Sequence, residues 1–118
     1  YQYMTELFTT GQVEKLKSEA ARMVKDPKYK FFDFEDQFNK AGYNILGSGQ
    51  IKEAVFIFQM ITDLFPDSPN AWDSLAEGYL KAGDKIKALE LYNKALKMDP
   101  NGVTGKNAKK MINEIEKN

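Results

Sequence analysis

Cysteine and histidine are both absent from the sequence. Without a thiol, the chain forms no disulfide, carries no thiolate nucleophile and builds no cysteine-ligated zinc site. Without an imidazole, it holds no Ser-His-Asp triad, no histidine-ligated zinc and no histidine acid or base. We therefore expect neither a catalytic residue nor a metal or other cofactor in this chain.

Net charge and long apolar runs are lacking as well. The 17 basic and 17 acidic residues cancel, so no overall field attracts nucleic acid or an anionic membrane surface. No apolar run approaches the roughly 20 residues that a membrane span needs, and no signal-peptide pattern is visible. The chain begins at Tyr1 rather than at a methionine, which predicts a fragment or a processed product of a longer protein.

A repeat of 34 residues is the strongest pattern that the chain does contain. Pro66 and Pro100 are 34 positions apart, and the same offset joins residues of matching size and character. These pairs are Phe38 with Trp72, Gly42 with Ala76, Ile45 with Tyr79, Gly49 with Gly83, Ala54 with Ala88, and Phe58 with Tyr92. So many matches in one register indicate two copies of one structural unit.

Each unit is predicted to be a pair of helices. In the first unit, apolar spacing favours helices from about Phe34 to Leu46 and from about Ile51 to Leu64, with Asp33 as the N-cap. In the second unit, Ser68 caps a helix that starts at Pro69. The tiny residues Gly42, Ala76, Ala54 and Ala88 allow the paired helices to approach closely and leave space for aromatic side chains.

Both ends are predicted to be helical. Residues 103–118 carry an apolar stripe of Ala108, Met111, Ile112 and Ile115, with Thr104 as the expected cap, which favours a helix that covers the last repeat. Residues 1–34 are interpreted as a degenerate helical hairpin that turns at Gly11, in which Leu16 and Ala20 reverse the small and large positions of the repeat.

The second unit resembles the tetratricopeptide repeat (TPR). The resemblance rests on Trp72, Leu75, Ala76, Tyr79, Gly83, Ala88, Tyr92, Ala95 and Pro100, and more loosely on Phe38, Ala41, Gly42, Ile45, Gly49, Ala54, Phe58, Ile61 and Pro66. It implies an all-α fold, a solenoid of helical hairpins (an α-α superhelix) with about seven helices. The implied divisions are a front hairpin and linker at 1–34, repeats at 35–68 and 69–102, and a capping helix at 103–118.

The same resemblance implies a concave groove that binds a peptide or protein. By the family pattern, the first helix of each repeat lines this groove with Asp36, Asn39, Tyr43, Leu46 and Gly47, and with Asn70, Asp73, Glu77, Leu80 and Lys81. This mixture favours an extended peptide with basic and apolar residues, its backbone bonded by Asn39 and Asn70. The chaperone-tail clamp of the family needs lysines and asparagines at set positions. Asn39 with Tyr43 and Asp73 with Glu77 do not match it.

A second resemblance covers nearly the whole chain. "GYNIL", "FPDSPNAWDSL" and "YLKAGD" are similar to the C-terminal helical-repeat extension of bacterial serine hydrolases related to beta-lactamases and penicillin-binding proteins. This resemblance implies a catalytic domain upstream of Tyr1, and it favours a periplasmic or extracellular location over a cytoplasmic one. The chain is then either a free-standing interaction module or an accessory domain of that enzyme, and self-association stays open.

Four features invite a chemical interpretation, and each has a structural alternative that we favour. Ser74 has no histidine to activate it, and the residue three positions later is Glu77 rather than a lysine. Asp33, Glu35 and Asp36 suit a helix N-terminus better than a metal site. Trp72 fits core packing better than ligand stacking. The lysines of residues 107–118 are interspersed with glutamates, which favours a solvated face over a nucleic-acid patch.

Overall fold

The computed structural model describes residues 13–29 and 33–117, and every structural statement below concerns this part of the chain. The elements are α2 (Val13–Lys25), the 3-10 turn η1 (Pro27–Tyr29), α3 (Phe34–Gly47), α4 (Ile51–Leu64), α5 (Pro69–Lys81), α6 (Lys85–Met98) and α7 (Val103–Lys117). No strand occurs among these residues, and the predicted all-α fold is confirmed. The prediction of about seven helices compares with six α-helices among the described residues. The predicted turn at Gly11 and the helix expected before it fall in residues 1–12, outside the described residues.

The helix boundaries follow from local chemistry. The side chains of Asp33, Ser68 and Asp84 each accept a hydrogen bond from the backbone N–H three residues later, at 3.0, 3.4 and 3.0 Å. Each cap satisfies one amide that the first helical turn leaves without a partner. Gly49 and Gly83 have φ angles of +88° and +89°, a left-handed conformation that glycine adopts without strain. These two glycines reverse the chain within the hairpins α3–α4 and α5–α6.

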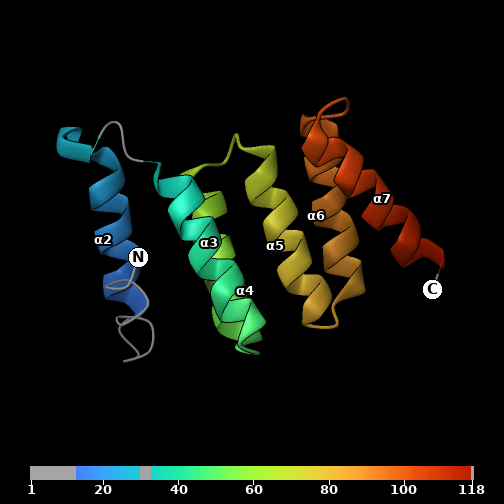
Figure 1. Cartoon of the computed structure of the whole chain (residues 1–118), viewed down its shortest axis with the longest axis horizontal. Helices are drawn as coiled ribbons and strands as arrows, with labels where there is room; N and C mark the ends of the chain where they lie inside the picture. The colour runs from blue at the N-terminus through green and yellow to red at the C-terminus, as the bar shows by residue number, and fades with distance from the viewer. Residues whose placement is uncertain (1–12, 30–32, 118) are drawn as a thin grey trace.

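The helices form two layers in a row of hairpins (Figure 1). The first helices of successive units, α3, α5 and α7, lie side by side, and α4 and α6 lie behind them. α5 is central, since it packs against α3, α4, α6 and α7. This arrangement places residues at 34-residue intervals on neighbouring helices, and it creates a surface that α3, α5 and α7 share.

The ring of Phe58 on α4 holds the two hairpins together. Its side chain is fully buried, and Tyr43 contacts it edge-on with ring centroids 5.0 Å apart. A Cβ atom added at Gly42 would lie 2.5 Å from Phe58 Cε1, and one at Gly78 would lie 3.1 Å from Phe58 Cδ2. The ring therefore fits between two helices only because both positions lack a side chain.

α7 occupies the position that the first helix of a third unit would have. Unlike such a helix, it packs against the rest of the chain on one face only. Its buried residues Gly105, Ala108 and Ile115 face the preceding hairpin. A further partner helix would meet α7 at the positions that correspond to Trp72, Leu75 and Ala76 of α5. In α7 these positions hold Lys106, Lys109 and Lys110, and all three lysines are exposed. α7 accordingly covers the core with one face and presents charge on the other.

Thr104 does not cap α7, so that prediction was wrong. The helix begins one residue earlier, at Val103. A Cβ atom at Gly102 or Gly105 would overlap Asp99, so glycine at both positions lets the first turn of α7 lie close to the end of α6.

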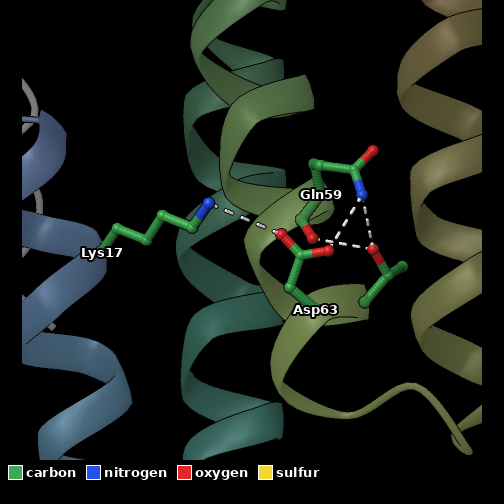
Figure 2. Close-up of polar contacts among 4 residues, drawn as sticks. Lys17, Gln59 and Asp63 are labelled. Carbon is green, nitrogen blue, oxygen red and sulfur yellow. Dashed lines mark hydrogen bonds and ion pairs between the residues drawn. The ribbon is translucent and has the colours of Figure 1, made fainter.

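α2 lies at the other end of the row, beside α4. Lys17 Nζ is 3.8 Å from Asp63 Oδ2, and Gln59 Nε2 donates to Asp63 Oδ1 (Figure 2). Gln59 Nε2 also lies 3.1 Å from the Thr62 hydroxyl oxygen. Ala20 is fully buried, so α2 covers one end of the core, although a half-exposed ion pair of this kind contributes little stability. The side chains of Leu16 and Tyr29, and the linker residues Phe31 and Phe32, lie outside the part of the chain that the structure describes. No described helix is long and apolar enough to span a membrane.

Candidate binding groove

Five of the residues predicted to line the groove enclose one pocket. Its volume is about 410 Å³, and it is lined by Tyr43, Leu46, Gly47, Gly49, Ile51, Glu77 and Lys81. The pocket lies between the C-terminal halves of α3 and α5, where the turn after α3 contributes Gly49 and the start of α4 contributes Ile51. Its wall is mostly apolar, with Glu77 and Lys81 as the two charged groups, so it can accept a bulky apolar side chain. We call it the apolar pocket.

A second, acidic hollow lies toward the N-terminal ends of α3 and α5. It measures about 250 Å³ and is lined by Asp33, Glu35, Asp36, Asn39 and Asn70. Several of these groups already have partners: Glu35 accepts a 2.6 Å hydrogen bond from the Ser68 hydroxyl, and Lys40 Nζ lies 3.1 Å from Asp36 Oδ2. Within the described residues, no group of three histidine, cysteine, aspartate or glutamate side chains could hold a metal ion.

Hydrogen bonds cross between the repeats in the region that separates these two hollows. The Ser74 hydroxyl donates to Asn39 Oδ1 at 2.7 Å, and the Tyr43 hydroxyl donates to Glu77 Oε1 at 3.0 Å. The two hydroxyl oxygens are 3.3 Å apart. Ser74 is 1% exposed and has a polar partner but no base, so it joins α3 to α5 rather than acting as a nucleophile.

Asp73 and Leu80, two further predicted groove residues, line neither hollow. Leu80 packs half-buried against the core, and Asp73 is only 8% exposed. Asn107 of α7 donates to both carboxylate oxygens of Asp73, at 3.1 and 3.2 Å. Sequence reasoning missed Asn107, although Asn39, Asp73 and Asn107 follow one another at the 34-residue interval and that interval could have identified it.

Burial raises the pKa of Asp73, the hydrogen bond from Asn107 opposes this rise, and the charge of Glu77 adds to it. Burial likewise raises the pKa of the Tyr43 and Tyr92 hydroxyls, and the negative charges of Glu77 and Asp73 raise it further. Glu114 of α7 acts on Tyr92 in the same direction. The carboxylates of α5 and α7 therefore make this part of the groove floor electronegative.

Asp73→Asn is expected to stabilise the protein at pH 7 but not in acid. Since the folded protein binds the Asp73 proton more tightly than the unfolded chain, stability falls as pH rises above the unfolded pKa of about 3.9. Asparagine keeps an acceptor for Asn107 and removes the buried charge. Urea unfolding of both proteins from pH 3.5 to 7 should show an advantage for the variant that grows with pH. A constant or opposite difference would contradict this assignment.

Trp72 serves the scaffold rather than a ligand in this structure. Its Nε1 donates to the carbonyl oxygen of Pro66 at 2.9 Å, and its ring packs half-buried against the core. Lys94 Nζ lies 4.4 Å from the ring centroid, at the distance of a cation–π contact. The indole edge and one ring face are thus already engaged.

Comparisons with known proteins support the presence of the repeat and support little else about this chain. Residues 69–101 match the tetratricopeptide repeat family model. The protein described as "Protein CTR9 homolog" from Arabidopsis thaliana is 27% identical to this chain over 100 residues, which is 85% of this chain and 9% of the plant protein. The chain therefore spans less than a tenth of that relative. The resemblance to bacterial serine hydrolases gains no support from these matches, and the predicted repeat boundaries stay predictions.

Proposed function

We propose that this chain is a non-catalytic TPR-type scaffold module that binds an extended segment of a protein through the groove between α3 and α5. A TPR repeat suggests a protein-interaction scaffold role. The observation that carries the finer proposal is the apolar pocket, which gathers Tyr43, Leu46, Glu77 and Lys81 from two successive repeats.

The groove is also suited to binding because its floor is already ordered. The bonds Ser74–Asn39 and Tyr43–Glu77 fix α3 against α5, and Asn107 fixes α7 against α5. A partner that enters an ordered groove meets a smaller entropic cost than one that must assemble it. No described residue of α2 lines the pocket.

No observation favours the alternative, an accessory domain of a serine hydrolase, beyond the sequence resemblance itself. We therefore do not advance it.

Gly47→Leu tests the groove with little risk to the fold. Gly47 lines the apolar pocket, and a Cβ added there meets no atom within 4 Å. Leucine is therefore expected to fill the pocket while stability stays equal or rises, since leucine is a better helix former than glycine. Peptides selected against the parent chain from a random decapeptide library should bind Gly47→Leu about tenfold or more weakly by fluorescence anisotropy.

Gly47→Ala is the matched control, because its single methyl group leaves most of the pocket empty. Affinity for this variant should stay within about twofold of the parent value. If the selected peptides bind Gly47→Leu and the parent chain equally well, the binding surface lies elsewhere and the groove proposal fails.

A further inference from the structure

We propose that the groove selects an extended peptide segment with a bulky apolar side chain and, three to five residues away, a lysine or arginine. This inference rests on the proposed function and adds the partner's chemistry and spacing. The apolar side chain enters the apolar pocket, and the basic side chain lies over the acidic hollow.

The apolar anchor follows from the lining of the pocket. Tyr43, Leu46 and Ile51 contribute apolar surface, and Gly47 and Gly49 contribute bare backbone. All three large side chains are only partly buried, so a ligand can cover apolar surface that the fold leaves exposed. Covering this surface removes it from water, which favours binding of an apolar side chain at this end.

The preference for a basic side chain follows from the negative charge of the groove. From Asp33 to Glu77, which covers α3, α4 and most of α5, acidic residues outnumber basic ones eight to two. On the groove itself, Asp33, Glu35 and Asp36 line the acidic hollow, and Glu77 lines the apolar pocket. Lys81 is the one cation that lines the apolar pocket among the described residues, at the end opposite Asp36. A partner that is basic toward Asp36 therefore complements this surface, whereas an acidic one is repelled.

The spacing follows from helix geometry. Asp36 and Asn39 precede Leu46 by ten and seven residues on α3. At 1.5 Å per residue these intervals correspond to about 15 and 10 Å along the helix. An extended peptide advances about 3.3 Å per residue, so about three to five of its residues cover the distance between the two hollows.

The selected decapeptides test this chemistry directly. We expect sequences enriched in a bulky apolar residue paired with lysine or arginine at a separation of three to five. For such a peptide, changing its basic residue to glutamate should weaken binding to the parent chain about tenfold, and raising salt should weaken the original peptide. The variant Asp36→Lys should lose affinity for the original peptide and regain affinity for the glutamate version.

Glu90→Lys is the matched control for charge, because it changes net charge equally on α6, outside both hollows. It should leave both affinities within about twofold. If Gly47→Leu abolishes binding but neither the peptide's charge nor Asp36→Lys matters, the inference fails and the proposed function stands. If no peptide exceeds background, or binding ignores Gly47→Leu, both fail. If the chain self-associates in sedimentation and Gly47→Leu prevents it, the groove holds a second copy and the peptide inference is wrong.

Discussion

Phe58→Ala is expected to lower the free energy of unfolding by about 3–5 kcal/mol, a large part of the stability of a domain of this size. The ring is fully buried and contacts both hairpins, at Gly42 on α3 and Gly78 on α5. Its loss leaves a cavity that neither glycine can fill. Urea denaturation followed by circular dichroism measures the change, and Ile86→Ala, at an 83% exposed position, should shift it by no more than about 0.5 kcal/mol.

A double-mutant cycle shows whether Phe58 is held by Gly42 as the structure indicates. Gly42→Ala places a methyl group against the ring and should destabilise the parent protein by about 1–2 kcal/mol, despite the better helix propensity of alanine. With leucine at position 58 the edge of the ring is absent, so the same substitution should cost less. Equal costs in the two backgrounds would mean that the residues do not interact.

The sequence predicted that a small residue such as Gly42 faces an aromatic ring, but it did not predict that Phe58 packs against Gly78. The 34-residue period pairs Gly42 with Ala76, which predicted small residues facing an aromatic ring within each hairpin. Gly78 could not be found in this way, because it packs on the ring of the preceding hairpin, and its counterpart Asn44 is exposed. The two repeats share their internal contacts but differ in what precedes them. α5 packs against the full hairpin α3–α4, whereas the described elements that precede α3 are α2 and η1.

The groove, like the contacts of Phe58, was predictable from the sequence only in part. Most of the residues on α3 and α5 that line the two hollows occupy positions that the family pattern names, since that pattern depends only on position along the first helix, but Glu35 does not. The family pattern did not predict that Asp73 is buried, because the burial depends on Asn107, whose side chain comes from a helix beyond the two repeats. Nor did it identify Ile51 and Gly49, which belong to the turn and to α4. Residues that reach the groove from elements other than the first helices could be identified only from the assembled structure.

Gly105→Ala is the second substitution from which we expect a large effect. A Cβ atom at Gly105 would overlap the backbone carbonyl oxygen of Asp99, and backbone cannot rotate away as a side chain can. α7 must therefore shift from the end of α6, at a net cost of about 2–3 kcal/mol after the gain in helix propensity. We expect lower thermal stability and faster hydrogen exchange in α7 than in α5.

Gly102→Ala provides the control, since the atoms nearest its Cβ would belong to the Asp99 side chain, which can move, and it should cost no more than about 0.5 kcal/mol. The displacement of α7 by Gly105→Ala also removes Asn107 from Asp73, which leaves a buried carboxylate without its donor. Asp73→Asn should therefore stabilise the Gly105→Ala protein at pH 7 more than it stabilises the parent. If the two gains are equal, α7 stays in place and the cost of Gly105→Ala has another origin; if the gain is larger, the third unit orders the groove floor through Asn107.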